Sequence, residues 1–387
     1  MLIALQSSAY ADDDYLTRSF EEVKSGSAIR LESASSDSYW TPGRLKNAKP
    51  RTPRVTVDKI LNLKMSTKSD ALVNSKTGIA EATNASRPAV RAEPDLENRL
   101  FVPETENQKS RARTGDVKRE TPQTAVRPQS VRTQHAHFTS SRLIPLSADL
   151  QYPYRAVGRL FYTQPGVGNF VCSAAVIEPR IILTAGHCVH SGSGGANGFY
   201  ANFAFVPAFR DGASPFQVWN GVYGIVTATW GNGGGRVPNA ADYALIELQD
   251  RPFAGAVRRI GMVTGSLGVK TRSLHPNHAH LLGYPVNLDR GMKMHQVTAQ
   301  RYGSGGINTI IYGSDMGPGS SGGPWVQNFQ SRAAGQTGGG NPGSNRVIGV
   351  TSYGAVSMGP RYEGSSILDA RFTEILSFMC ARRPANC

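Results

Sequence analysis

From about residue 141 onward, short apolar stretches alternate with polar and glycine-rich turns. Runs of this length, bounded by Gly, Pro, Asn and Ser, are typical of β-strands. They occur at 156–162, 170–177, 181–184, 224–229, 243–248, 281–284, 309–312 and 347–352. The chain also has 42 glycines and little helical periodicity. The pattern therefore predicts an all-β fold, either a sandwich or a barrel.

The C-terminal segment follows a different period. Its apolar residues recur every three or four positions, at Leu368, Phe372, Ile375, Leu376 and Met379. This spacing predicts a short closing helix over 368–379. The glycine-rich stretch at 334–345 predicts a surface loop. Because no run of about 18 apolar residues occurs, we expect no membrane-spanning helix.

Residues 12–140 are rich in Ser, Thr, Lys, Arg, Glu, Asn and Pro and have few aromatic residues. Such a segment buries too little apolar surface to offset its ordering entropy, so we expect it to be largely disordered. Brief helical or partner-binding pieces are expected at 15–20 and 59–63. A pro-region and a simple linker are both consistent with this composition. Residues 1–11 combine a short apolar run with A-Y-A at 9–11, which we interpret as the remnant of a secretion signal, truncated because it lacks a basic leader.

The chain has 42 Lys and Arg against 28 Asp and Glu, a formal net charge of +14. The excess is spread along the sequence, with no dense basic block containing interleaved aromatics. Nucleic acid is therefore not an expected partner. Spread positive charge favours contact with anionic cell surfaces.

The cysteines form two local pairs, Cys172 with Cys188 and Cys380 with Cys387. An even count in two tight pairs is typical of disulfides in an oxidising compartment, which predicts a secreted or periplasmic protein. Four reduced thiols or a metal site remain alternatives, although no C-x-x-C spacing is present. The H-x-x-H-x-H run at 275–280 does not bring imidazoles together on a strand or loop, so we expect no metal there.

Three separated motifs carry the candidate chemistry. They are L-T-A-G-H-C around His187, D-Y-A-L-I beginning at Asp242, and G-S-S-G-G-P around Ser321. A serine hydroxyl is a poor nucleophile at neutral pH and needs a histidine base, and a carboxylate must hold that imidazole in the right tautomer. The order His, Asp, Ser is that of the trypsin and chymotrypsin class, and not that of subtilisins or α/β-hydrolases.

With these motifs, residues 150–387 resemble the chymotrypsin-like serine peptidases. The resemblance implies two antiparallel six-stranded β-barrels, at roughly 150–260 and 261–387, within a peptidase domain at 141–387. The segments Y-P-Y-R-A-V-G-R-L at 152–160, G-Y-P at 283–285 and Y-G-S-D-M-G-P-G at 312–319 are similar to the bacterial branch related to glutamyl endopeptidases. No cofactor is implied, and the partners are protein or peptide substrates.

The resemblance implies a role for each motif residue. Ser321 is the nucleophile, His187 the general base and then acid, and Asp242 the group that orients His187. The backbone N–H groups of Gly319 and Ser321 form the oxyanion hole. The stretch V-T-S-Y-G at 350–354 resembles the strand that pairs with the substrate backbone, with Ser352 touching Asp242 and with Tyr353 and Gly354 lining the S1 pocket.

Two positions depart from the family pattern. Ser320 occupies the place where trypsin-like zymogens have an aspartate that pairs with a new N-terminus. Activation by such an ion pair is therefore not expected, and removal of 12–140 would act by releasing a steric block or after assisting folding. Thr351 replaces the histidine that glutamate-specific relatives have at that place.

The P1 preference stays open between three classes. Asp315, six residues before Ser321, has the spacing of a pocket-floor aspartate, which favours Lys or Arg at P1, but it also fits a loop-supporting role. Small or mixed P1 residues are the next interpretation, and an acidic P1 is disfavoured by Thr351. Two non-catalytic functions are alternatives. One is an inactive trypsin-fold binding protein, and the other is an envelope-binding protein in which the N-terminal region makes the contact.

Overall fold

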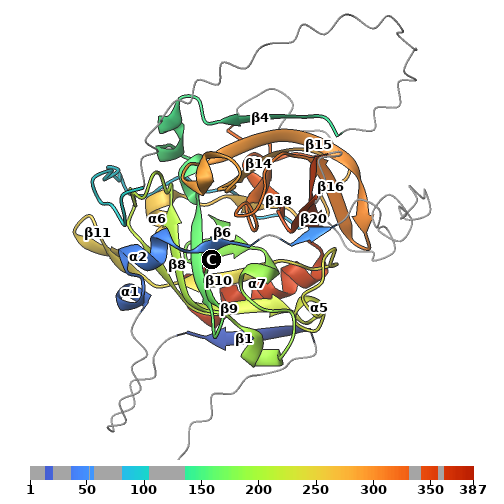
Figure 1. Ribbon diagram of the computed structural model, residues 1–387, viewed down its shortest axis with the longest axis horizontal. Coiled ribbons are helices and arrows are strands. Elements are labelled where there is room, and N and C mark those ends of the chain that lie inside the picture. Colours follow the sequence, from blue (N-terminus) through green and yellow to red (C-terminus); the bar gives the residue numbers. More distant parts are fainter. Residues whose placement is uncertain are drawn as a thin grey trace, which may run out of the picture.

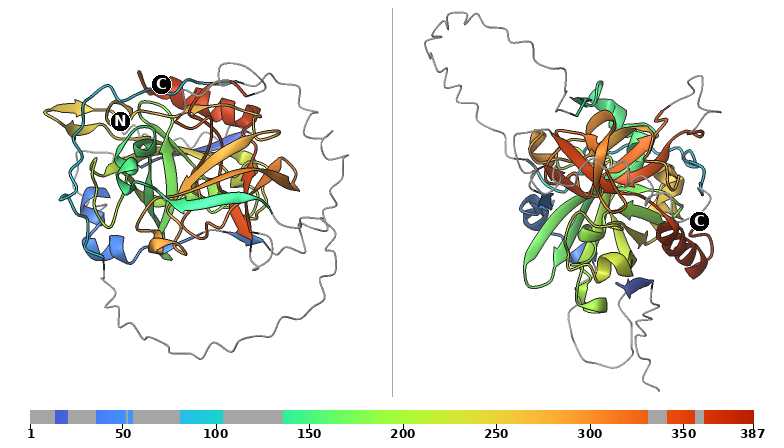
Figure 2. Two further views of the ribbon diagram at one scale, coloured as in Figure 1. Left: turned by 90° about the horizontal axis from the view of Figure 1, so that it is seen from above. Right: turned by 90° about the vertical axis from the view of Figure 1, so that its right-hand side faces the viewer.

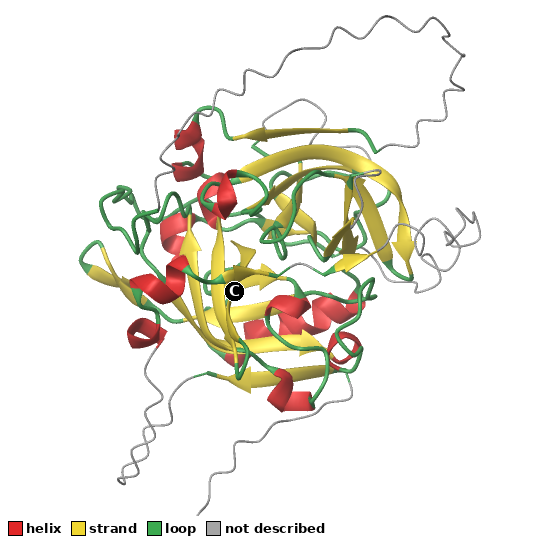
Figure 3. Ribbon diagram, viewed as in Figure 1, coloured by secondary structure: helices red, strands yellow, loops and turns green. Residues whose placement is uncertain are grey.

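The computed structural model describes residues 14–20, 36–51, 53–55, 81–103, 136–330, 341–355 and 361–387. Strands dominate this part of the chain, and the few helices are short apart from the C-terminal one (Figure 3). The all-β prediction is confirmed. Among the described residues, no helix is long and apolar enough to cross a membrane.

The first half of the domain is a closed antiparallel barrel of six strands (Figure 1). Its strands are β5 (Val157–Gln164), β6 (Gly168–Val176), β7 (Ile181–Thr184), β8 (Ala201–Pro207), β9 (Trp219–Thr227) and β10 (Ala244–Leu248). They run in the order β9-β10-β7-β6-β5-β8, and pairing of β8 with β9 closes the ring. Since closure leaves no free edge within the ring, every strand of it has two hydrogen-bonded neighbours.

The second half is a ten-stranded sheet. Apart from β3 and β4, its strands follow a small hairpin of β11 (Arg251–Phe253) and β12 (Ala256–Arg258) and the helix α6 (Ile260–Thr264). The sheet has the order β13-β18-β17-β14-β15-β16-β20-β19-β3, with β4 on β15. Its strands are β13 (Gly268–Val269), β14 (His278–Gly283), β15 (His295–Gly306), β16 (Thr309–Gly313), β17 (Pro324–Gln327), β18 (Arg346–Val350), β19 (Tyr353–Ala355), β20 (Tyr362–Ser366), β3 (Arg54–Val55) and β4 (Phe138–Arg142).

The C-terminal helix α7 (Ala370–Arg382) begins two residues after the predicted start and runs three residues further. Asp369 caps its first turn by accepting a hydrogen bond from the N–H of Arg371. Phe372, Ile375 and Met379 are buried against the large apolar cluster that also fills the first barrel. The helix lies at the outer edge of the molecule (Figure 2), so its apolar stripe packs inward as the spacing predicted.

Parts of residues 12–140 are ordered and pack on the domain, which is an exception to the largely disordered region that composition predicts. The piece expected to be helical at 15–20 is instead the strand β1 (Tyr15–Ser19), which pairs with the edge of β9. The strand β2 (Lys49–Pro50) pairs with β6. Between them lie the short helices α1 (Ser36–Tyr39) and α2 (Pro42–Lys46). Isolated apolar side chains anchor these pieces: Leu45 and Phe101 are buried, and Phe20 and Trp40 contact the core. The expected pieces at 1–11 and 59–63 lie outside the described residues.

Candidate active site

The pairing of two barrel strands brings His187 and Asp242 together. His187 lies in a 3-10 turn (Gly186–Cys188) directly after β7, and Asp242 precedes β10, which pairs antiparallel with β7. The Asp242 carboxylate accepts two hydrogen bonds, from the His187 backbone N–H to Oδ1 and from ring Nδ1 to Oδ2, each 2.8 Å long. Both side chains are buried. The second ring nitrogen, Nε2, has no hydrogen-bond partner and is available to accept a proton.

Glycine at 186 permits this close approach. A Cβ placed there would lie 2.8 Å from the Trp230 ring and 3.0 Å from Asp242 Oδ1. The first distance is shorter than real Cβ contacts and the second is at the tight end of their range, so a side chain at 186 would force the histidine turn or the Trp230 ring to shift. The fold therefore favours glycine at position 186 of the histidine motif for steric reasons.

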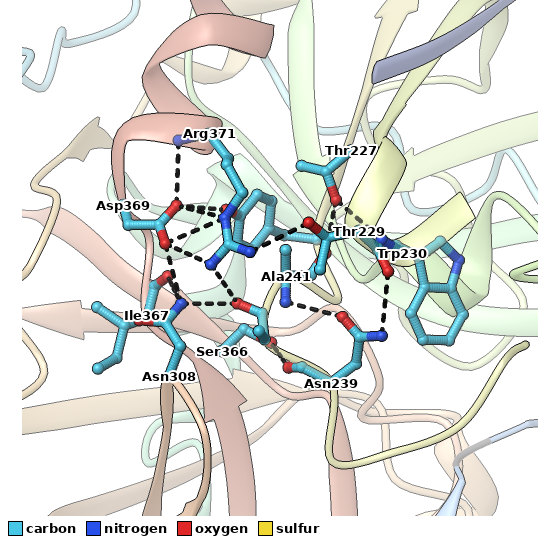
Figure 4. A network of polar contacts seen from close by, with 12 residues as sticks. Thr227, Thr229, Trp230, Asn239, Ala241, Asn308, Ser366, Ile367, Asp369 and Arg371 are labelled. Carbon is cyan, nitrogen blue, oxygen red and sulfur yellow. Dashed lines mark hydrogen bonds and ion pairs between the residues drawn. The ribbon is translucent and has the colours of Figure 1, made fainter. Parts of the chain in front are cut away.

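A polar network fixes the loop that carries Asp242 (Figure 4). The Asp242 N–H donates to Ser366 Oγ (3.0 Å), and that hydroxyl donates to the Asn239 carbonyl oxygen (2.7 Å). The carbonyl oxygen of Ala240 accepts hydrogen bonds from Asn308 and Arg371. These partners come from three different segments, and the sequence alone gave no reason to connect them to Asp242.

Ser352 makes the contact with Asp242 that the resemblance implies. Its hydroxyl donates to Asp242 Oδ2, the same oxygen that accepts from His187. Three donors, two from His187 and one from Ser352, fix the orientation of the Asp242 carboxylate. The structure therefore places Ser352, Asp242 and His187 in one hydrogen-bonded chain.

Strand β6 holds both the histidine turn and the serine loop. Cys172 forms a disulfide with Cys188, next to His187. The following residue, Ser173, donates from its backbone N–H to the Ser321 carbonyl oxygen (2.7 Å) and from its hydroxyl to the Gly319 carbonyl oxygen (2.9 Å). Two adjacent residues of β6 thus hold the histidine turn and the serine loop against the same strand.

Two glycines shape the serine loop. Gly319 has φ +102° and Gly322 has φ +75°, a region that other residues rarely adopt. A Cβ at Gly319 would lie 2.5 Å from the Tyr284 carbonyl oxygen, and one at Gly322 would lie 2.0 Å from Thr184 Oγ1. Both positions therefore require glycine, which gives the G-S-S-G spacing a conformational cause.

Both predicted disulfides are present, Cys172–Cys188 and Cys380–Cys387. Cys172, His187 and Cys188 lie close enough to form a metal-binding group by distance alone. Because the two sulfur atoms are bonded to each other, they cannot act as thiolate ligands.

The residues predicted to bind substrate lie near the serine loop. Thr351 exchanges backbone hydrogen bonds with it, accepting from Gly322 (2.8 Å) and donating to Gly323 (3.0 Å). Tyr353 is fully buried, and its ring packs in a small cluster with Ile311 and Tyr362. At Gly354 an added Cβ would meet only the Tyr362 carbonyl oxygen, at 3.8 Å, so space is open on that side.

Asp315 and Glu363 are two acidic groups beside this loop. Asp315 is partly buried, and its Oδ1 has no hydrogen-bond partner. Glu363, on β20, is fully buried and binds three hydroxyl groups, those of Ser314, Ser320 and Thr351. Burial, and to a smaller extent the neighbouring charge of Asp315, raises the pKa of Glu363 to about 8 although the three hydroxyl hydrogen bonds lower it.

Sequence reasoning missed Glu363. One signal could have found it: a single acidic residue stands in a strand of small and aromatic residues, Y-E-G-S-S, that leads to the C-terminal helix.

No family model matches the chain. A curated relative, the glutamyl endopeptidase of Bacillus licheniformis, is 28% identical over 187 residues, which cover 47% of this chain and 51% of that protein. The chain is similar to the glutamyl endopeptidases. It spans about half the length of this curated relative.

Solved structures of bacterial serine proteases are similar too. The thermostable serine protease AL20 from an extremophilic microorganism is 26% identical, with a TM-score of 0.48, over 59% of this chain and 98% of that one. The protease Anisep from Arthrobacter nicotinovorans is 25% identical, with a TM-score of 0.46, over 58% of this chain and 94% of that one. A Glu endopeptidase in complex with MPD is 20% identical, with a TM-score of 0.46, over 62% and 96%.

Proposed function

We propose that this chain is an exported serine endopeptidase whose triad is His187, Asp242 and Ser321. The observation that carries the proposal is the pair of hydrogen bonds from His187 to one buried carboxylate, with Nε2 left without a partner. This arrangement fixes the tautomer that has a basic Nε2. The similarity to glutamyl endopeptidases supports the same assignment. The two disulfides support an oxidising compartment outside the cytosol.

The reaction proceeds in two half-reactions. Ser321 Oγ attacks the carbonyl carbon of the scissile bond while His187 Nε2 takes the hydroxyl proton. The N–H groups of Gly319 and Ser321 stabilise the negative oxygen of the tetrahedral intermediate. His187 then gives its proton to the leaving amine, and an acyl-enzyme forms. Water, deprotonated by His187, attacks the ester and releases the carboxylic acid and the free serine.

Asp242 stabilises the imidazolium that exists between these proton transfers. The backbone N–H of His187 and the hydroxyl of Ser352 fix the orientation of its carboxylate. Because the carboxylate is already oriented, little reorganisation accompanies the transfer. No cofactor takes part in this mechanism.

A basic P1 residue is the preference we propose. Asp315 lies six residues before Ser321, and its partly buried carboxylate has an oxygen without a hydrogen-bond partner. Such an oxygen is satisfied by a Lys or Arg side chain of the substrate. Thr351, where a histidine would suit glutamate, supports the same direction.

Residues 12–140 are proposed to be a pro-region. Its described pieces pair with both halves of the peptidase domain, which a passive linker would not need to do. Because Ser320 has no carboxylate, activation does not use an ion pair between this residue and a new N-terminus.

The test is covalent labelling combined with substrate profiling. A fluorophosphonate probe should label the wild-type protein at Ser321, and a peptide library should be cut after Lys or Arg. Ser321→Ala should abolish both, while Ser193→Ala, an exposed serine elsewhere, should change neither. Labelling of Ser321→Ala at the wild-type rate would refute the triad. A folded protein that neither reacts nor cuts would favour the inactive binding protein.

A further inference from the structure

Glu363 connects three segments around the proposed nucleophile. It lies on β20, opposite Tyr312 on β16 and Gly354 on β19. Its carboxyl group is within hydrogen-bond distance of Ser314 Oγ (3.0 Å), Ser320 Oγ (2.5 Å) and Thr351 Oγ1 (3.2 Å). One side chain thus contacts the loop after β16, the residue before Ser321 and the segment that leads into β19.

Two acceptor oxygens lie within hydrogen-bond distance of the Ser320 hydroxyl, which has one proton to donate. Its Oγ lies 2.7 Å from the Gly317 carbonyl oxygen and 2.5 Å from Glu363 Oε1. A hydroxyl donates only one hydrogen bond, and a carboxylate only accepts. Both contacts are satisfied if Glu363 is a neutral acid whose O–H donates to Ser320 Oγ, since the Ser320 proton then goes to Gly317.

The other two hydroxyls agree with this assignment. Thr351 Oγ1 accepts from Trp325 Nε1 (3.0 Å), and Ser314 Oγ accepts from the Met316 N–H (3.2 Å). Each hydroxyl therefore has its own proton available for Glu363 Oε2, which accepts both. With Glu363 neutral, each donor proton in this group of side chains has its own acceptor.

The electrostatic surroundings favour the neutral form. No described Lys or Arg lies within ion-pair distance of Glu363, and the charged group that faces it is Asp315. The titratable side chains on the flanking strands are phenols, Tyr312 and Tyr353, and burial raises the pKa of both. They stay neutral, so burial and Asp315 together oppose ionisation of Glu363.

We propose that Glu363 is a positioning residue that holds the nucleophile loop in its working conformation as a neutral carboxylic acid. The inference rests on the proposed function. Ser320 stands where trypsin-like zymogens use an aspartate paired with a new N-terminus, and the hydrogen bond from Glu363 supplies the missing anchor. Ionisation would draw the Ser320 proton to the carboxylate and leave the Gly317 carbonyl oxygen without its donor. The loop that carries Gly319 and Ser321 would then loosen.

The test compares the pH dependence of kcat in the wild type and in Glu363→Gln. Gln cannot ionise, donates to Ser320 and still accepts from Ser314 and Thr351. We expect wild-type kcat to fall about tenfold per pH unit above the pKa of Glu363, which is about 8. Glu363→Gln should keep kcat within about threefold at pH 6.5 and lose the alkaline decline. Glu363→Ala should lower kcat at every pH, with KM changed less.

Three results would overturn the proposal. One is a wild-type profile that stays flat to pH 10, and another is an unchanged alkaline decline in Glu363→Gln. The third is an effect on Lys and Arg substrates alone, which would place Glu363 in the P1 pocket.

Thermal melting at pH 5, 7 and 9 gives a readout that does not need turnover. The melting temperature of Glu363→Gln should rise relative to wild type as pH increases. If Ser321 never reacts with the probe, the proposed function fails, and this melting comparison alone decides whether Glu363 is held neutral.

A second, independent observation concerns the edge of β19. Residues 53–55 pair with it in parallel, with Gly354 opposite Arg54 and Ala355 opposite Val55. The Gly354 N–H donates to the Pro53 carbonyl oxygen (3.3 Å). In Figure 1, β3 is the blue strand beside β20, between the two halves of the domain. A strand edge offers one set of N–H and C=O groups, so β3 and a substrate backbone compete for it.

Several contacts hold the preceding residues in place on the first barrel. The Trp40 indole N–H donates to the Asn202 carbonyl oxygen (2.7 Å), and its ring lies 5.6 Å from that of Phe161. The Tyr39 hydroxyl donates to Asn169 (2.8 Å). These contacts place β3 close to β19 and raise its effective concentration there.

We infer that residues 39–55 act as a built-in competitor that keeps the full-length chain latent. Trp40→Ala in the full chain should raise kcat/KM several-fold for peptides that extend to P3 and beyond. The rate for a single-residue ester, which does not need the strand edge, should stay unchanged. Phe20→Ala is the matched control, since it weakens a different N-terminal aromatic contact, the one with Phe203. Equal peptide rates for wild type and Trp40→Ala, or an equal rise in Phe20→Ala, would overturn the inference.

Discussion

The hydroxyl of Ser173 donates a hydrogen bond to the carbonyl oxygen of Gly319 and accepts one from the N–H of Tyr284. The same residue binds the Ser321 carbonyl oxygen through its backbone. It therefore connects the first barrel, the serine loop and the start of the segment after β14. We expect the position of the serine loop to depend on this one side chain.

Ser173→Ala tests that dependence. The substitution leaves two buried backbone groups without partners, which costs about 1–3 kcal/mol of unfolding free energy. Because the Gly319 segment loses its support, kcat should fall more than KM changes. Urea denaturation and steady-state kinetics measure the two effects, with Ser193→Ala as an exposed control. An unchanged kcat together with the expected loss of stability would show that the backbone hydrogen bond alone positions the loop.

Asp242→Asn should nearly abolish turnover while the fold is kept. Asn can present an N–H to His187 and so reverse the tautomer, and in related triads this costs about 10⁴ in kcat. Circular dichroism should be unchanged, and single-turnover acylation should be slow. A loss below about tenfold would contradict the role of Asp242 as the group that orients His187.

The two disulfides should differ in what they stabilise. Cys172–Cys188 closes a loop with a sequence separation of 16, and Cys380–Cys387 closes one of 7. In the chain-entropy model the longer loop contributes about 3 kcal/mol, and the shorter one slightly less. Cys172→Ser/Cys188→Ser should also lower kcat, because Cys188 adjoins His187. Cys380→Ser/Cys387→Ser is the control, and it should lower the melting temperature without changing kcat.

Arg371 supports the Asp242 loop from the start of α7 (Figure 4). Its guanidinium binds the Asp369 carboxylate and the Ala240 carbonyl oxygen. Arg371→Gln leaves Asp369 with Asn308 and Tyr243 as hydrogen-bond donors, and we expect a loss of about 1–3 kcal/mol in unfolding free energy. The Asp242 loop should also become more mobile, which hydrogen exchange at residues 239–242 would detect. Unchanged exchange there would show that Asn308 and Ser366 suffice to hold the loop.

Asp315→Ser separates the two roles open to that carboxylate. If Asp315 binds the P1 side chain, the preference for Lys and Arg in a peptide library should fall at least tenfold. If it supports the loop, the cleavage profile should stay unchanged while the melting temperature falls. The profile is read by mass spectrometry of the cut sites.

Local sequence predicted five of the six strands of the first barrel and the C-terminal helix, but it missed β8. The apolar stretch at 181–184 is β7 residue for residue, and the one at 243–248 is β10 with one extra residue. These strands are buried and short, so their side chains alone specify them. Strand β15 was also missed, because its twelve residues include four Gly and Ser and only three aliphatic or aromatic side chains. It is a strand because β14, β16 and β4 pair with it.

The sequence by itself determined the candidate triad residues, the two disulfides and the helical period at the C-terminus, because each is written in residue types at short spacing. Only the tertiary structure decided that Glu363 lies under the serine loop and that residues 53–55 pair with β19. The physical reason is sequence separation, because these contacts join residues that are 43 and about 300 positions apart. They also depend on which strand edges are left unpaired once the two sheets have formed. A buried carboxylic acid and a two-residue edge strand have no local signature, so their roles follow from packing and not from pattern.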